Sequence, residues 1–373
     1  MDIQVRYAES EDELQAIYRL RYEIYGQEMN LKSRAVDHQN KVLTDANDDT
    51  ARILFATVDD ELVGTLRLHW GGDAPFPAEF DETYDLKRFE SVVSPDQMVI
   101  FTRFMVRKQF RGTMLPFQLL GAIAKFSLEH NVRLSFCDCQ PHLLNLYTRL
   151  GYRTYTKTYN DEMMGLLVPL VLVVEDVEYF QRLNSPLLAF ADPNYSPAYP
   201  EEIVSLIPQA PVIQSVAQEA AAQWAHSFGL LSDSHERTST IFDGLDDDDV
   251  TKLMKRSFII KCELDDHIIK KNSVDRTMFI ILAGLIEIRE GDQVVAVLSQ
   301  GDVVGELAFL LHSERLSDVF AASEDVQLLS LNEKAILDLM ENESALAARL
   351  FFNLAKVVSI KMGSLYQWAF TKN

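Results

Sequence analysis

The chain has 373 residues, more than the ~150–200 residues of a typical single domain, so two domains and a connection are expected. Its hydrophobic content of 47% is enough to give each domain a core. Lys and Arg number 35 against 56 Asp and Glu, which gives a formal net charge of −21. Because such a surface repels polyphosphate backbones and anionic membranes, nucleic acid is not an expected partner.

The three cysteines form an odd and sparse set that fits a reducing cytoplasm. Cys137 and Cys139 lie two positions apart on one expected strand, where the extended backbone hinders a bridge between them. No apolar run reaches the ~18–20 residues of a membrane span, and the first residues do not resemble a signal peptide. We therefore expect a cytoplasmic protein without a membrane span.

The first half of the chain alternates helical and strand patterns. Ser10 and Glu13 form a capping-box pattern before apolar residues at helical spacing, and two apolar runs around the polar turn 59–61 predict a hairpin. The expected elements are a helix over 11–28, strands over 53–58, 62–70 and 99–106, a basic loop over 107–113, a helix over 114–128, a strand over 134–139, a short helix over 143–150 and a strand over 166–174. This order indicates an α/β domain over residues 1–185.

A proline-rich connection follows this domain. Six of the 12 prolines lie between residues 184 and 211, which disfavours any regular element there. An alanine-rich helical pattern over 212–228 comes next. We assign residues 186–235 to the linker.

Residues 236–373 have the pattern of a β-barrel domain. The acidic run 243–249 favours the start of a helix, because negative charge stabilises helix N-termini. Short alternating strands are expected over 258–261, 267–270, 278–283, 285–289, 294–298 and 319–322, followed by closing helices over 335–362. The expected fold class is therefore α+β, with an α/β domain followed by an antiparallel barrel or jelly roll and flanking helices.

Residues 305–317 resemble the phosphate-binding cassette of cyclic nucleotide-binding domains, in which a Gly-Glu-Leu turn precedes an arginine and small residues. A cyclic phosphate inside a barrel needs an arginine fork and backbone N–H groups to replace its hydration, and a carboxylate suits the ribose 2′-OH. The resemblance implies that Glu306 binds the ribose and that Arg315 binds the phosphate. The remaining predicted contacts are Gly305, Leu307, Ala308, Leu316 and Ser317.

Other details of the cassette bear on its ligand. Leu316 takes the position at which a threonine marks guanine preference, which favours cAMP. Asp318 would repel a phosphate if it pointed inward. The alternative is a barrel kept for structure or dimerisation, with Glu306 and Arg315 paired to each other. No DNA-reading helix-turn-helix is expected after the barrel, so transcription control is disfavoured.

Residues 104–114 resemble the strand and pyrophosphate loop of GNAT acyltransferases. Coenzyme A or a carrier-protein phosphopantetheine presents phosphates to backbone N–H groups, and a glycine permits their close approach. The implied acyl-donor site consists of Phe104, Met105, Val106, Gln109, Arg111, Gly112, Thr113 and Met114. Residues 145–152 resemble the GNAT signature in which a tyrosine protonates the leaving thiolate, so Tyr147 is the candidate general acid, with plain packing as the alternative.

Four short motifs also resemble those of acyl-homoserine-lactone synthases and N-acyl amino acid synthases. The residues that match are Arg21 and Tyr25, implied to bind substrate, and Asp45, Asp48, Arg67 and Arg103, implied to act in catalysis. The alternative is a structural ion-pair network. Ile100 stands where the lactone synthases carry a glutamate, which disfavours lactone formation.

The reaction implied by these resemblances is attack of an amine on an acyl thioester, with acyl-CoA or an acyl carrier protein as donor and no metal. It requires an unprotonated amine, an oxyanion donor such as a backbone N–H near 104–106, and a proton for the thiolate. Glu28, Asp45 or Asp48 would orient the amine or take its proton through water. We expect an N-acyltransferase regulated by cAMP. A homodimer is an open alternative to a monomer. The alternatives are a non-enzymatic cAMP sensor whose degenerate GNAT domain binds an acyl carrier or partner protein, and a cAMP-regulated protein lysine acetyltransferase.

Overall fold

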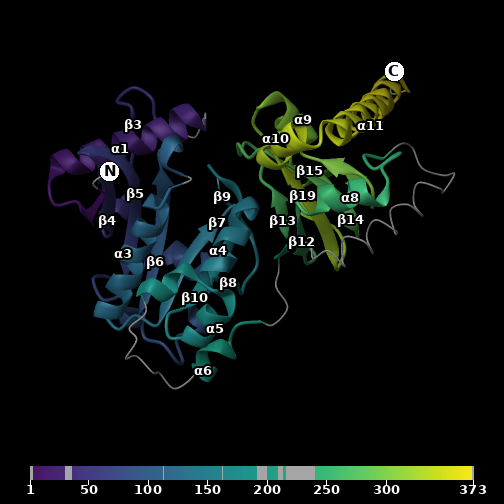
Figure 1. Ribbon diagram of the computed structural model, residues 1–373. Coiled ribbons are helices and arrows are strands. Elements are labelled where there is room, and N and C mark those ends of the chain that lie inside the picture. Colours follow the sequence, from purple (N-terminus) through teal and green to yellow (C-terminus); the bar gives the residue numbers. More distant parts are fainter. Residues whose placement is uncertain are drawn as a thin grey trace. The chain divides into compact units, whose positions relative to one another are not determined.

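The computed structural model describes residues 3–29, 36–111, 113–161, 163–190, 200–208, 213–215 and 240–371 (Figure 1). The chain forms two compact units. The first unit comprises residues 1–159 and 167–211, and the second comprises residues 160–166 and 212–373. Within the described ranges, no helix has both the length and the apolar character needed to cross a membrane.

An eight-stranded sheet forms the centre of the first unit, in the order β1-β4-β5-β6-β7-β10-β8 with β9 beside β10. Its strands are β1 Ile3–Tyr7, β4 Arg52–Val58, β5 Glu61–Trp70, β6 Met98–Val106, β7 Leu134–Cys139, β8 Arg153–Thr154, β9 Tyr159–Asp161 and β10 Gly165–Val173. β4 and β5 form the antiparallel hairpin that the sequence predicts. The short strands β2 Val36–Asp37 and β3 Val42–Leu43 pair separately.

In the proline-rich stretch 184–211, where the sequence disfavours any regular element, a short helix does form over residues 201–204, because Pro200 lies at its N-cap and not inside it. The helices of the first unit include those predicted over 11–28, 114–128 and 143–150 and three that were not predicted. They are α1 Glu11–Tyr22, α2 Ala78–Thr83, α3 Leu115–Glu129, α4 Leu144–Leu150, α5 Val177–Leu183 and α6 Glu201–Val204, with a π-helical segment Glu23–Glu28 that extends α1. The predicted capping box begins α1: Ser10 Oγ accepts the Glu13 N–H at 3.3 Å, and Glu13 accepts the Ser10 N–H at 3.1 Å.

Helices cover both faces of the central sheet. Ile17 of α1 packs against Ile53 and Phe55 of β4. On the other face, a Cβ added at Gly64 of β5 would lie 3.0 Å from the side chain of Leu119 in α3, so the glycine lets α3 approach the sheet closely. We call these two faces the α1 face and the α3 face.

Strands β6 and β7 are parallel neighbours that pair only at their beginnings. Their register runs from Met98 opposite Leu134 to Ile100 opposite Phe136. β6 continues to Val106 and β7 to Cys139 without further pairing, so the sheet opens between them.

A β-bulge lies in β6 beside this opening. Thr65 of β5 pairs with Met105, but Arg67 pairs with Thr102, which leaves one extra residue in β6. Arg103 within the bulge has a positive φ of 53°. The bulge therefore changes the direction of the Arg103 side chain.

The second unit is built from two antiparallel sheets, as expected for a jelly roll. Their orders are β11-β12-β19-β14-β17 and β13-β18-β15-β16. The strands are β11 Ile213–Ser215, β12 Phe258–Cys262, β13 His267–Ile269, β14 Thr277–Ala283, β15 Ile286–Glu290, β16 Gln293–Leu298, β17 Val303–Val304, β18 Asp318–Ala321 and β19 Val326–Asn332. The predicted fold class is thus confirmed.

Four described helices flank these sheets: α8 Asp247–Met254, α9 Glu306–Leu311, α10 Glu333–Asn342 and α11 Ser344–Thr371. The acidic run does begin a helix, because the Asp246 side chain accepts the Asp249 N–H at 2.8 Å. Leu253, Leu339 and Leu350 bring α8, α10 and α11 into one core with β14 and β19.

The predicted helix over 212–228 is wrong at residues 213–215, which form β11 and pair with β12. Pairing with an exposed strand edge satisfies this backbone in place of a helical turn. The rest of that predicted helix lies outside the described residues.

Candidate functional site

A network of charged side chains lies on the α1 face of the first unit. Arg21 Nη1 donates to both oxygens of Asp48, at 2.7 and 2.9 Å. Arg67 Nη1 lies 3.3 Å from Asp48 Oδ1 and also pairs with Asp45. Arg103 Nη2 lies 2.7 Å from Asp45 Oδ2. The four short motifs of the sequence therefore meet in one network.

Local structure explains why both aspartates point the same way. Asp45 precedes a 3-10 turn, Ala46–Asp48, and its side chain accepts the Asn47 N–H at 3.1 Å. The Asp48 carboxylate accepts the Asp45 N–H at 3.0 Å in return. The Asp-x-x-Asp motif is thus a capping box that fixes two carboxylates beside β5 and β6.

Burial and charge oppose each other in this network. Burial alone would raise the pKa of Asp45, but the charges of Arg67 and Arg103 outweigh it and hold that pKa at about 2. Asp48 also has a lowered pKa, because Arg21 and Arg67 outweigh the effect of its burial. Both carboxylates are therefore ionised at neutral pH.

In the ion pairs between described residues of this network, three guanidinium groups face two carboxylates. His69 on the same face adds no charge, since burial and Arg67 lower its pKa to about 4. Nε and Nη2 of the fully buried Arg21 have no hydrogen-bond acceptor among the described residues. Arginine guanidinium groups bind carboxylates through paired hydrogen bonds.

The residues around the network differ in their access to solvent. The side chain of Arg103 is 16% exposed and that of Asp45 is 25% exposed, whereas that of Arg21 is fully buried. The ring of Tyr25 lies 5.7 Å from Arg103 Cζ, within cation–π range. Arg103 and Asp45 are therefore the members of the network that an incoming molecule can reach.

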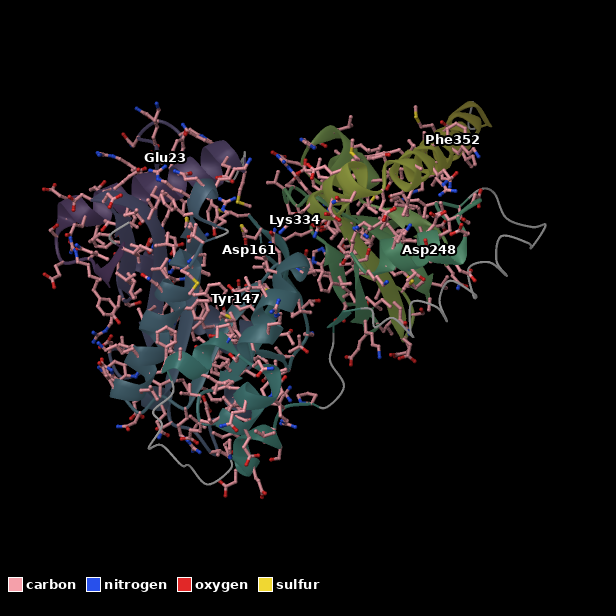
Figure 2. The ribbon with its side chains drawn as sticks, in the orientation of Figure 1. Glu23, Tyr147, Asp161, Asp248, Lys334 and Phe352 are labelled. Carbon is pink, nitrogen blue, oxygen red and sulfur yellow. The ribbon has the colours of Figure 1, made fainter. Side chains whose placement is uncertain are left out.

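Tyr147 lies on α4, inside the first unit (Figure 2). Its helix ends at Gly151, whose φ of 112° suits glycine and where a Cβ would lie 2.5 Å from the Phe180 ring. The Tyr147 ring packs edge-on against Tyr152, with centroids 5.6 Å apart. Burial raises the pKa of Tyr147 well above its ordinary value, so its hydroxyl keeps its proton at neutral pH.

The basic loop between β6 and α3 is held by acidic partners. Arg111 forms two bonds with Glu28, at 2.6 and 2.9 Å, and donates from Nε to Val106 O at 2.8 Å. Arg107 lies 2.7 Å from Glu23. Glu28 therefore lies against the predicted donor loop, outside the network of Asp45 and Asp48.

The end of this loop leads directly into α3. Thr113 Oγ1 accepts the Leu115 N–H at 3.2 Å, and the Met114 side chain is 63% exposed. Gly112 lies outside the described residues. An apolar pocket on the α3 face lies further along the same helix, lined in part by Leu120, Ile123 and Tyr152.

In the second unit, Arg315 is almost fully buried beneath the predicted cassette. Its Nη1 donates to Gly305 O at 2.9 Å, and its Nη2 donates to Asp275 at 2.9 Å and also to Thr277 O. Gly305 has a φ of +80°, and a Cβ there would lie 2.3 Å from Arg315 Nη1. The glycine is therefore needed both for the turn and for the position of Arg315.

Glu306 begins α9 and is paired with a distant lysine. Lys361 Nζ of α11 lies 2.9 Å from Glu306 Oε1 and also donates to Val303 O. Asp318 faces β13, where it accepts from His267 Nε2 and from the Lys271 N–H, both at 2.9 Å. Asp318 is thus engaged by donors of its own.

Two family models match the chain, one in each of the two regions that the sequence analysis assigned to a domain. Residues 16–174 match the model described as N-acyl amino acid synthase FeeM, and residues 259–343 match that of the cyclic nucleotide-binding domain. The chain joins an acyltransferase domain like the N-acyl amino acid synthases to a cyclic nucleotide-binding domain. The predicted resemblances to the N-acyl amino acid synthases and to cyclic nucleotide-binding domains are therefore confirmed. No curated protein sequence matches the chain.

Solved structures resemble each domain separately. The CoA-dependent acyl-homoserine lactone synthase MesI is 18% identical and covers 52% of this chain and 97% of its own, with a TM-score of 0.39. The related synthase BjaI is 16% identical over 50% and 91%, with a TM-score of 0.38. A cyclic nucleotide-binding domain from Methylobacillus flagellatus is 14% identical over 43% and 90%, with a TM-score of 0.37.

The structure places the predicted residues in three groups. Arg21, Asp45, Asp48, Arg67 and Arg103 form the network of the synthase-like domain, with Tyr25 beside it. The predicted donor contacts lie along β6 and the following loop: Phe104, Met105, Val106, Gln109, Arg111, Thr113 and Met114. The predicted nucleotide contacts surround α9: Gly305, Glu306, Leu307, Ala308, Arg315, Leu316 and Ser317.

Some residues that no sequence motif indicates reach these groups from distant positions in the chain. In the nucleotide-binding domain they are Asp275 and Lys361, which hold Arg315 and Glu306. In the synthase-like domain, Asp138 of β7 accepts hydrogen bonds from Tyr84 and Tyr159. Among the described residues, no group of three or more His, Cys, Asp or Glu side chains could hold a metal ion.

Proposed function

We propose that the protein transfers an acyl group from acyl-CoA or an acyl carrier protein to the α-amine of an amino acid, under control of cAMP. The gathering of Arg21, Arg67 and Arg103 on one face, with Arg103 partly exposed, carries this proposal. An amino-acid acceptor brings a carboxylate, the group that arginine side chains bind most specifically. The name of the matching family, N-acyl amino acid synthase, agrees with that acceptor class.

The chemistry needs few groups from the protein. The amine nitrogen attacks the thioester carbonyl, the C–N bond forms, and the C–S bond breaks. Tyr147 gives its proton to the departing thiolate, a role that the resemblance of residues 145–152 to the GNAT signature supports. Backbone N–H groups near the β6 bulge are the proposed donors to the oxyanion.

The acyl donor is proposed to bind at the opening between β6 and β7 and along the GNAT-like loop 107–114. In this proposal, Gly112 and the backbone N–H groups at the start of α3 bind the pyrophosphate of coenzyme A. The apolar pocket beside Leu120 and Tyr152 supports an aliphatic acyl group, because Tyr152 packs directly on Tyr147.

Control by cAMP is proposed from the cassette around Glu306 and Arg315. The buried arginine would bind the cyclic phosphate, and the Glu306 carboxylate would accept the ribose 2′-OH. Leu316 after the arginine favours adenine over guanine, as the sequence resemblance implies. A ligand acts on the other domain only through different affinities for two arrangements of the chain.

Acyl transfer can be tested with the full chain, a mixture of the 20 amino acids and acyl-CoA donors of increasing chain length. Mass spectrometry of N-acyl products and release of free CoA report transfer. We expect Arg103→Gln to lower kcat/KM for the amino acid by about 10–100-fold, because a charged hydrogen bond contributes about 1.5–3 kcal/mol. Arg6→Gln removes an exposed arginine of the same unit and serves as the control.

The two alternatives give different results in this assay. A lysine acetyltransferase would acylate a protein substrate but no free amino acid. A non-enzymatic sensor would bind cAMP and release no CoA. Either result would overturn the proposed acceptor.

A further inference from the structure

Asp138 is a carboxylate near the carboxyl end of β7, outside the network of Asp45 and Asp48. It is half-buried on the α1 face, in line with Phe136 two residues earlier. Tyr159 Oη donates to Asp138 Oδ2 at 3.0 Å, and Tyr84 Oη donates to the same oxygen. Two hydroxyl donors on one oxygen stabilise the ionised carboxylate and fix its direction.

Its position follows from the opening between β6 and β7. Ile100 and Phe136 are the last paired residues, and they share the α1 face. Thr102 and Asp138 each lie two residues further along their own strand, so they stand on the same face at opposite sides of the opening. Arg67 Nε donates to Thr102 Oγ1 at 2.9 Å, which places the arginine network on the β6 side.

The two sides of the opening therefore carry opposite charges. The β6 side carries the guanidinium groups of Arg21, Arg67 and Arg103, and the β7 side carries the Asp138 carboxylate. A free amino acid carries the complementary pair, a carboxylate and an ammonium group. We propose that Asp138 binds the ammonium group of the acceptor and takes its first proton. This inference rests on the proposed amino-acid acylation.

The proton balance of the reaction requires such a group. An ammonium nitrogen has no lone pair, so one N–H bond must break before attack, and its proton goes to Asp138 and then to water. The neutral amine attacks the thioester carbonyl and loses a second proton as the C–N bond forms. That proton balances the one that Tyr147 gives to the thiolate. The products are an N-acyl amino acid, a free thiol and one proton released to water.

Tyr84 is suited to remain a hydrogen-bond donor to Asp138 throughout the reaction. Burial, followed by the charge of Asp138, raises the pKa of Tyr84 well above its ordinary value. Its hydroxyl therefore stays protonated over the pH range of an enzyme assay. The Tyr84 ring is packed against Phe80 at 5.5 Å and Phe136 at 6.4 Å, which limits its motion. Asp138 is thus held in place before a substrate arrives.

The first test compares Asp138→Asn with the wild-type chain in the amino-acid acylation assay. We expect kcat/KM at neutral pH to fall by about 10²–10⁴-fold and to rise steadily with pH as the free amine becomes more abundant. Hydroxylamine, which is already uncharged at neutral pH, is expected to react at similar rates with both proteins. Asp96→Asn removes an exposed carboxylate of the same domain and is the matched control.

A second variant covers the case in which Asp138→Asn does not fold. Tyr159→Phe keeps the carboxylate but removes one hydrogen bond to its ionised form, which should raise the pKa of Asp138. The acid limb of the kcat/KM–pH profile should therefore move to higher pH by about half a unit to one unit. A purely structural Asp138 would leave that limb unchanged, and this result would overturn the inference.

The outcomes separate the two proposals. If the wild-type chain acylates amino acids and Asp138→Asn keeps both its rate and its pH profile, the role of Asp138 is wrong and the function stands. An equal loss with hydroxylamine and with amino acids would also contradict the role of Asp138. If the wild-type chain acylates none of the 20 amino acids, the proposed function fails and the role of Asp138 fails with it.

Discussion

Glu306 and Arg315 lie nine residues apart in the nucleotide cassette, yet each is paired with a different distant residue. Glu306 lies 2.9 Å from Lys361 of α11, and Arg315 lies 2.9 Å from the buried Asp275. The sequence left open a structural barrel in which these two residues pair with each other. The structure shows another arrangement, in which one predicted ribose contact is held by the last helix.

The first prediction concerns Lys361. A nucleotide that bonds to Glu306 must compete with this lysine, so Lys361→Met should strengthen cAMP binding. A partly buried pair contributes about 0.5–1.5 kcal/mol, which corresponds to about 2–10-fold in Kd by calorimetric titration. Lys356→Met changes a lysine that lies over the Phe352 ring of the same helix and should leave Kd unchanged. Equal affinities of the Lys361 variant and the wild-type chain would contradict competition at Glu306.

The second prediction concerns Gly305. An alanine there would place Cβ 2.3 Å from Arg315 Nη1 at a φ of +80°, so Gly305→Ala should displace the arginine and weaken cAMP binding by about 10-fold or more. The backbone strain should also lower the free energy of unfolding by about 1–3 kcal/mol.

Gly291→Ala is the matched control for Gly305. Its φ is also positive, at 58°, but apart from its chain neighbours no atom of the described residues lies within 4 Å of the added Cβ. It should show the loss of stability without the loss of nucleotide affinity. A Gly305 variant with unchanged Kd would show that Arg315 does not bind the phosphate.

The third prediction concerns stability in acid. The pKa of Asp45 is about 2 in the folded chain, below its ordinary value of 3.8. Its ionisation therefore stabilises the fold above pH ~4, and this stabilisation is lost as the pH falls toward 2. The contribution at neutral pH is about 2 kcal/mol. In urea unfolding from pH 2 to 6, Asp45→Asn should be less stable at pH 6 and depend less on pH, and an unchanged slope would contradict the ion-pair network.

The fourth prediction concerns Tyr147. Tyr147→Phe removes the proton proposed for the thiolate and should lower kcat by about 10²–10⁴-fold with little change in KM for the acceptor. Tyr7→Phe removes a hydroxyl from β1, where the ring packs edge-on against Phe126 at 6.4 Å, and is the control. A full rate in Tyr147→Phe would leave that ring only a packing role.

Local patterns account for the parts of the fold that the sequence predicts. The Ser10–Glu13 capping box and the hairpin of β4 and β5 depend on neighbouring residues only. The cassette is one contiguous segment, so its residues can be recognised together. The strand at 213–215 depends on pairing with β12, which the alanine-rich local pattern does not contain.

The residues that the sequence does not predict act across long separations. Lys361 reaches Glu306 over 55 positions, and Tyr84 reaches Asp138 over 54 positions. Neither pair belongs to a motif with fixed spacing. The sequence does contain one indication of the Asp138 site, because a carboxylate lies between two cysteines at the end of an apolar strand. That pattern predicts a site only when the separation of β6 and β7 is known.

The most direct test of the whole account is acyl transfer to the 20 amino acids by the full chain, measured with and without cAMP and with cGMP as control. We expect N-acyl amino acids whose rate of formation changes with cAMP in the wild-type chain but not in Arg315→Lys. The account would be contradicted if no N-acyl amino acid formed with any acyl-CoA or acyl carrier protein donor. It would also be contradicted if the rate of formation were the same with and without cAMP.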